Sequence, residues 1–189
     1  MIERQRQATM ATQRDGSILW VALFTAASAV TTAALACATP FPALAALAAV
    51  HLGRRHGLAL MLIGWGVSQV VGIGLHHYPH DPSTIGWGVT LGLASVAALL
   101  GGSWATLQLA RKPAWMRLAC GYGAAFVAFK LAVLGGGLLL GGVGTALAPT
   151  LIARQLVRDG LILFGLHLFY RVLREAGVPA PHPRQVQTA

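Results

Sequence analysis

The stretch Arg111-Lys112-Pro113-Ala114-Trp115-Met116-Arg117 separates two long apolar segments, residues 85–109 and 118–140. Three cations and a proline fall within these seven positions, whereas the two apolar segments contain a single charged side chain, Lys130. An apolar stretch of about 20 residues is long enough to cross the hydrocarbon core of a bilayer as a helix. The pattern predicts two transmembrane helices joined by a short basic turn.

The other basic side chains gather in similar short segments along the chain. The four clusters are Arg4/Arg6/Arg14, Arg54/Arg55, Arg111/Lys112/Arg117 and Arg171/Arg174/Arg184. The connectors 37–42, 76–84 and 141–145 contain neither lysine nor arginine. Because lysine and arginine accumulate in cytoplasmic loops of membrane proteins, this alternation predicts that every basic cluster and both termini are cytoplasmic.

The predicted fold is an all-α integral membrane protein with six transmembrane helices. The predicted spans are at about residues 17–36, 43–52, 58–75, 85–109, 118–140 and 147–173. The second span is short and would cross only with its flanks or in a thinned bilayer. We expect a membrane domain at residues 17–174, disordered cytoplasmic ends at 1–16 and 175–189, and a multi-pass location in a bacterial-type cytoplasmic (inner) membrane.

The composition separates this chain from soluble and nucleic-acid-binding proteins. It is 56% hydrophobic and 10% charged, with a mean hydropathy of +0.65, whereas soluble domains carry about 25% charged residues. The net charge of +9 sits at span ends without a basic face of interleaved aromatics, so anionic lipid is a better partner than nucleic acid. Walker A, GxSxG, HExxH and CxxC motifs are absent from the sequence, so we do not expect the chain to hydrolyse nucleotide by itself. We favour a non-enzyme and keep a membrane enzyme as an alternative.

Charged side chains inside the predicted spans are the first candidate site. They are Lys130, Arg154, Arg158 and Asp159, with Gln155 beside them. Antiparallel neighbouring spans would place Lys130 and Asp159 at similar depth, which predicts an ion pair that is either structural or part of a site open to the outside. Arg154 and Arg158 share a helix face. One aspartate cannot neutralise three cations, so the surplus favours a substrate carboxylate or phosphate, or lipid headgroups reached by Arg154.

The connector after the third span is the second candidate. It contains His76, His77, Tyr78, His80 and Asp81 within six positions. Imidazoles and a carboxylate this close could hold a transition metal, although the spacing matches no closed zinc pattern. The alternatives are a solvated loop and direct contact with a substrate.

Two further sets of residues have weaker patterns. His51 and His167 lie near the predicted cytoplasmic ends of their spans and could ligate a haem between helices. Small residues recur one turn apart in the first span, at Ala22, Ala26, Ala29 and Ala33. Such a stripe allows close helix approach in lipid, either within this chain or with a partner membrane subunit.

With this alanine stripe and the turn Leu52-Gly-Arg-Arg-His-Gly-Leu-Ala59, the chain resembles a substrate-binding S component of the energy-coupling-factor vitamin transporters. The resemblance implies six helices and cytoplasmic termini. It also implies that the alanine stripe faces a coupling transmembrane subunit that works with ATPases. The substrate would sit in an outward-facing cavity capped by loops 37–42 and 76–84.

The resemblance also suggests a substrate class. Some solitary proteins similar to S components are linked to cobalamin, with a thiolate near the cobalt. Here loop 76–84 has His80, a candidate cobalt ligand, and no cysteine, while Cys37 could approach from the first loop. A smaller anion such as biotin would suit Lys130, Arg154 and Arg158 equally well.

We therefore expect uptake of a vitamin or similar cofactor, with cobalamin favoured. The alternatives are a haem- or metal-binding membrane subunit, an accessory or assembly subunit without a ligand, and a membrane enzyme.

Overall fold

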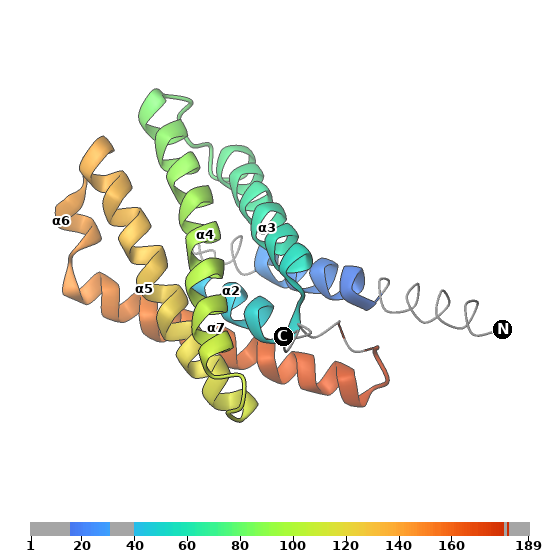
Figure 1. The fold of residues 1–189 in the computed structure, drawn as a ribbon. Helices are drawn as coiled ribbons and strands as arrows, with labels where there is room; N and C mark the ends of the chain where they lie inside the picture. Colours follow the sequence, from blue (N-terminus) through green and yellow to red (C-terminus); the bar gives the residue numbers. More distant parts are fainter. Residues whose placement is uncertain (1–15, 31–39, 180, 182–189) are drawn as a thin grey trace.

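The computed structural model describes residues 16–30, 40–179 and 181, and all regular structure within these ranges is helical (Figure 1). This confirms the predicted all-α class. The described helices are Gly16–Val30, α2 (Phe41–His51), α3 (Arg54–Gly74), α4 (Pro82–Gln108), α5 (Ala114–Leu140), α6 (Val143–Ala146) and α7 (Pro149–Glu175).

Three of these helices, α3, α4 and α5, are long and apolar enough to cross a membrane. They expose large apolar side chains, such as Val70, Leu93 and Val127, on their outer surfaces. Exposed apolar side chains spread along long helices are suited to contact with lipid. The predicted membrane character is therefore supported by the third, fourth and fifth spans.

The other three predicted spans have a different character. The Gly16–Val30 helix and α2 are apolar but short, and the 11 residues of α2 extend over only about 16 Å at 1.5 Å per residue. The 27-residue α7 is long enough to cross, but it contains Arg154, Arg158, Asp159, Arg171, Arg174 and Glu175. The six-span topology with cytoplasmic termini therefore stays a prediction.

The short helix α2 occupies the centre of the bundle (Figure 1). All residues from Phe41 to Val50 are buried, and α2 packs against α3, α4, α5 and α7. A helix that is apolar around its whole circumference is stable only when other elements surround it. The alanine- and leucine-rich sequence of α2 thus explains its position, which requires no crossing of the bilayer by α2 itself.

Helices α4 and α5 form the most extensive pair in the bundle. They approach closely at Gly101 of α4, where an added Cβ would lie 2.8 Å from the Cβ of Ala128 and 3.0 Å from the carbonyl oxygen of Ala124. Small residues at such a contact allow two backbones to come together. This close pairing forms the wall on which the other helices pack.

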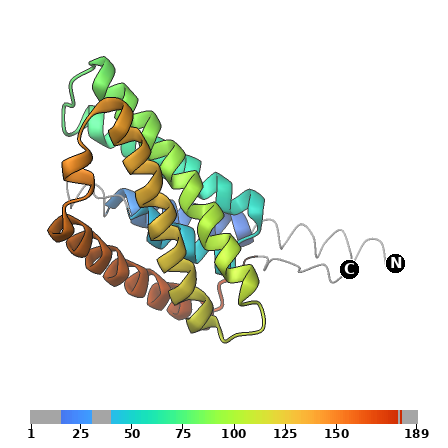
Figure 2. The same cartoon turned by 60° about the vertical axis from the view of Figure 1, so that its left-hand side comes forward.

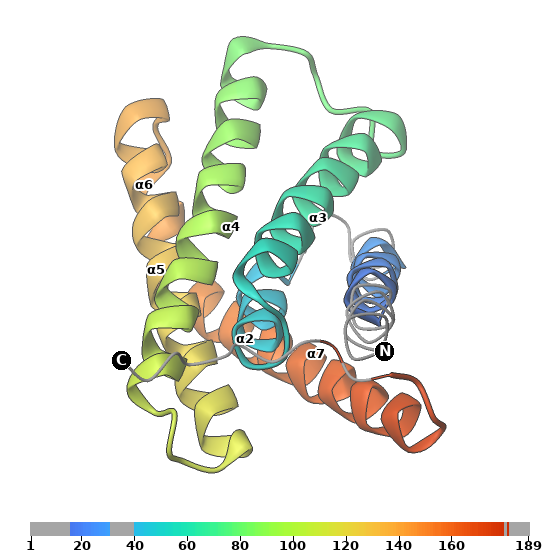
Figure 3. The ribbon, with the colours of Figure 1, turned by 45° about the vertical axis from the view of Figure 1, so that its right-hand side comes forward.

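Helix α7 runs obliquely across the bundle and not alongside α5 (Figures 1 and 3). Figure 2 shows the reason: α6 leads from the end of α5 back to the start of α7, which therefore begins part-way along α5. Two glycines with positive φ, Gly141 at 86° and Gly142 at 100°, make the reversal between α5 and α6. Only glycine adopts such angles at low cost.

The chain after α7 folds back onto the bundle. Gly177 has a φ of 94°, and the Val178 N–H donates to the carbonyl of Leu173 at 3.0 Å, which is a Schellman end to the helix. Trp20 Nε1 then donates to the carbonyl of Pro179 at 2.8 Å. The start of the tail therefore makes hydrogen bonds with the bundle. The disorder expected for residues 1–16 and 175–189 stays a prediction, because 1–15, 180 and 182–189 lie outside the described ranges.

Candidate functional site

A cavity of about 1290 Å³ lies between α3, α4, α5 and the first half of α7. Figure 3 shows that α3 and α4 diverge toward the loop that joins them. Residues of that loop and the two glycines after α5 also line the cavity. The cavity is thus the space enclosed by three candidate membrane spans and one helix with several charges.

The structure brings most of the predicted polar residues of the spans into this cavity. Lys130 of α5 lines it together with Arg154, Gln155 and Arg158 of α7. Lys130, Gln155 and Arg158 are half-buried, and Arg154 is exposed. The shared face predicted for Arg154 and Arg158 from their spacing is confirmed.

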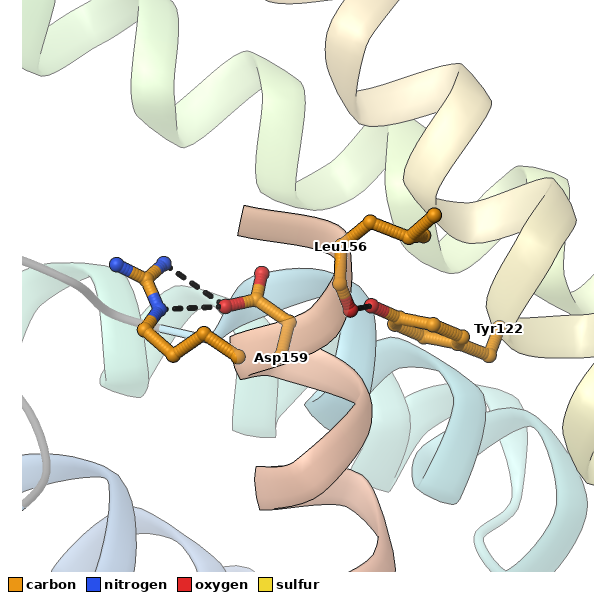
Figure 4. A network of polar contacts seen from close by, with 4 residues as sticks. Tyr122, Leu156 and Asp159 are labelled. Carbon is orange, nitrogen blue, oxygen red and sulfur yellow. Dashed lines mark hydrogen bonds and ion pairs between the residues drawn. The ribbon is translucent and has the colours of Figure 1, made fainter. Parts of the chain in front are cut away.

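The carboxylate of Asp159 does not line the cavity and lies behind it, fully buried. Nε and Nη2 of Arg158 both donate to its Oδ1, at 3.0 and 2.8 Å (Figure 4). The side chain of Arg158 keeps 33% of its surface exposed. One guanidinium therefore neutralises a buried carboxylate while its outer surface lines the cavity.

The predicted ion pair between Lys130 and Asp159 is wrong. Among the described residues Asp159 pairs with Arg158 instead, and Lys130 Nζ lies 5.9 Å from the ring centroid of Phe126. The physical reason is that α7 crosses α5 obliquely, whereas the prediction assumed two antiparallel neighbours at matched depth. Within the described chain, Lys130 and Arg154 are cavity cations without a carboxylate in ion-pair contact.

A tyrosine that the sequence did not single out holds α7 against α5. The Tyr122 hydroxyl donates to the carbonyl of Leu156 at 2.6 Å (Figure 4). Its ring lies 3.7 Å from the position that a Cβ on Gly160 would take. This hydrogen bond joins α5 to α7 two residues before Arg158. Nothing in the sequence distinguishes Tyr122 from an ordinary packing aromatic.

The loop between α3 and α4 contributes only part of the predicted histidine cluster. Tyr78, His80 and Asp81 line the cavity, whereas His76 and His77 do not. The His76 ring stacks on Tyr78 with centroids 6.1 Å apart, and His77 is exposed with a φ of 50°. The Tyr78 ring in turn lies against Gly72, where an added Cβ would be only 2.9 Å from it.

Asp81 has a structural role that its place in the histidine cluster did not reveal. Its Oδ1 accepts the Thr84 backbone N–H at 2.7 Å, which caps the N-terminus of α4. Across the described residues, no group of three or more His, Cys, Asp or Glu side chains is arranged to hold a metal ion. Cys37, the other predicted ligand, lies outside the described ranges.

The wall between α3 and α4 contains cavity residues that we did not predict. They are Trp65, Ser68, Gln69 and Trp87. Trp65 Nε1 donates to the carbonyl of Gly88 at 2.8 Å, and Gln69 Nε2 donates to Ser68 Oγ at 3.1 Å. Ser68 and Gln69 are adjacent polar side chains in an otherwise apolar segment, and that signal could have identified them.

The remaining predicted sets lie elsewhere. His51 and His167 stack with ring centroids 5.8 Å apart, and the Tyr170 ring lies 4.2 Å from that of His51. Ala22 and Ala26 are exposed on the Gly16–Val30 helix and Ala29 is half-buried; Ala33 lies outside the described ranges.

Comparison with protein-family models, with curated proteins and with solved structures finds no match for this chain. The first cavity combines cations and aromatic side chains around a large open volume, which are features of pockets that bind small molecules.

Proposed function

We propose that this protein is a membrane-embedded binding protein for the uptake of a vitamin or similar cofactor that carries an anionic group. The observation that supports this most strongly is the 1290 Å³ cavity lined by Lys130 and Arg154, which pair with no carboxylate among the described residues. Carboxylate and phosphate oxygens are the natural partners of such cations.

The size of the cavity supports a large ligand. Pockets for drug-sized molecules are about 300–1,000 Å³, and this cavity is larger. Trp65, Trp87 and Phe129 supply flat apolar surface, and Gln69 supplies an amide. Cobalamin combines a large ring with amide groups and a phosphodiester, so we favour it over a small anion such as biotin. His80, which lines the cavity, is the candidate ligand for its cobalt.

The proposed mechanism is capture from outside, closure of the loop between α3 and α4, and reorientation in the membrane. His80 and Tyr78, with His76 and His77 behind them, would gate the cavity. A separate ATPase module with a coupling transmembrane subunit would supply the energy. The exposed Ala22 and Ala26 supply a surface of small residues on which such a subunit could dock.

Thermal stabilisation in detergent tests this function. A ligand that binds only the folded protein raises its stability by an amount that grows with the logarithm of ligand concentration above the Kd. We expect one large shift in a panel of cobalamin, biotin, riboflavin and thiamine, with haem and divalent metals alongside. A folded protein that none of these ligands stabilises would point to an accessory subunit.

A second candidate is a haem-binding membrane subunit, and the proximity of the His51 and His167 rings favours it. Purified protein would then show a Soret absorbance band that disappears in both His51→Ala and His167→Ala. A colourless preparation that acquires no band when haem is added would exclude it.

A further inference from the structure

A second cavity, of about 440 Å³, lies at the opposite end of α7 from Arg154 and Arg158. His51 of α2 and Tyr170, Arg171 and Arg174 of α7 line it, together with Pro181 of the returning tail. Arg174 follows Arg158 by 16 positions, which corresponds to about 24 Å along a helix. The second cavity is thus separate from the first.

Positive charge exceeds negative charge around this second cavity. Glu175 is the one carboxylate among the described residues that line it. Its contact with Arg171 is long, at 3.9 Å, and both side chains are largely exposed, so the pair contributes little. Arg174 makes no ion pair within the described ranges. Arg117 of α5 and Arg174 are both near enough to His51 to act on it electrostatically.

A buried polar atom of the cavity lining lacks a partner. Among the described residues, His51 Nε2 is buried without a hydrogen bond. The same holds for His167 Nδ1 and Arg117 Nε, which do not line the cavity but belong to residues that interact with His51. Buried polar atoms in folded proteins are nearly always paired, with protein, water or a bound ion. Guanidinium and imidazole nitrogens surrounded by cations suit a ligand that accepts hydrogen bonds and carries negative charge, and they disfavour a metal ion.

We propose that this second cavity binds a phosphate group. The group would come either from the headgroup of an anionic phospholipid or from a small soluble phosphate compound. Arg171, Arg174 and His51 would supply donors, and the ring of Tyr170 would pack against the rest of the ligand. The bond from Trp20 to Pro179 holds the tail beside the cavity, so occupancy would link the Gly16–Val30 helix, α2 and α7.

Thermal unfolding of the full chain in detergent tests this proposal in two arms. One arm titrates sodium phosphate against sodium chloride of equal ionic strength. The other titrates dioctanoyl phosphatidylglycerol against dioctanoyl phosphatidylcholine. We expect the unfolding temperature to rise above that of the control titration in at least one arm, and to keep rising with the logarithm of ligand concentration. Stabilisation by phosphate assigns a soluble ligand, and stabilisation by phosphatidylglycerol alone assigns the lipid headgroup.

Matched variants make the result specific to this cavity. Arg174→Gln and Arg171→Gln should each weaken the apparent affinity about tenfold, because each removes charge-assisted hydrogen bonds. Arg55→Gln, an exposed arginine outside both cavities, should bind as the parent does. No shift beyond the control titration in either arm, or equal affinity in the parent and in whichever of the two cavity variants folds, would overturn the proposal. Arg154→Gln should leave this binding unchanged, so the result is independent of the proposed vitamin site.

Discussion

Arg158 and Asp159 are consecutive residues of α7, yet their side chains form an ion pair in which two nitrogens of the guanidinium donate to one carboxylate oxygen (Figure 4). Asp159 is fully buried, and the guanidinium separates it from the cavity that Arg158 lines. The pair holds the cationic surface of Arg158 in place, so the stability of α7 and the charge of the cavity depend on the same contact.

The first prediction concerns this pair. Arg158→Met leaves the Asp159 carboxylate buried without a partner, and we expect a loss of about 3–5 kcal/mol in the free energy of unfolding. Adding Asp159→Asn removes the uncompensated charge, so the double variant should recover most of the lost free energy of unfolding. Chemical unfolding in detergent measures both variants. Arg154→Met, which changes an exposed cavity cation, is the control and should unfold like the parent. A double variant as unstable as the single one would contradict this account.

The second prediction concerns ligand affinity. Lys130→Met and Arg154→Gln each remove a cavity cation that pairs with no carboxylate in the described chain. We expect each to weaken binding of an anionic vitamin about tenfold or more, because a hydrogen bond to a charged group contributes about 1.5–3 kcal/mol. Equilibrium binding of the vitamin found in the stabilisation panel provides the measurement. Unchanged affinity in both variants, with Arg55→Gln as reference, would remove these cations from the site.

The third prediction concerns the loop between α3 and α4. A methyl group at Gly72 would collide with the Tyr78 ring, so Gly72→Ala should displace the loop and alter the rates of ligand binding and release. Gly74 has open space around its Cβ position, so Gly74→Ala is the matched control two residues away. Stopped-flow binding compares the two variants. Identical kinetics would mean that the position of Tyr78 does not control access.

The fourth prediction concerns the contact between α4 and α5. Gly101→Ala places a methyl group 2.8 Å from the Cβ of Ala128, and backbone lies on the same side. We expect a loss of about 1–3 kcal/mol from this overpacking. Gly123→Ala, at an α5 position with no neighbouring atom within 4 Å, should be neutral or slightly stabilising because alanine favours the helix. Chemical unfolding of both variants in detergent measures the difference. Equal stability of the two variants would show that the helices adjust at this contact.

The fifth prediction concerns topology. Single cysteines at Arg55, at the start of α3, and at Ser83, in the first turn of α4, should react with a membrane-impermeant thiol reagent from opposite sides of the membrane. Cys37 and Cys120 are first replaced by alanine. We expect Ser83→Cys to react with the reagent from outside in intact cells. We expect Arg55→Cys to react only after the membrane is permeabilised, as the positive-inside rule requires. The reverse pattern would invert the predicted orientation.

The sequence by itself determined where the helices lie. The apolar segments at residues 58–75, 85–109 and 118–140 became α3, α4 and α5 with small shifts at their ends, because helix formation and hydropathy are properties of local sequence. Three charged residues of the spans, Lys130, Arg154 and Arg158, were also recognisable as cavity residues, since charge within an apolar segment requires a polar surrounding.

The tertiary structure decided which residues meet. Because α7 crosses α5 obliquely, Asp159 pairs with Arg158, and Lys130 lines the cavity. The spacing of residues on one helix contains no information about the angle at which another helix crosses it. The same holds for α2, whose burial on every side depends on its neighbours. Trp65 and Trp87 became cavity walls because α3 and α4 diverge, a relationship between two helices that neither segment encodes alone.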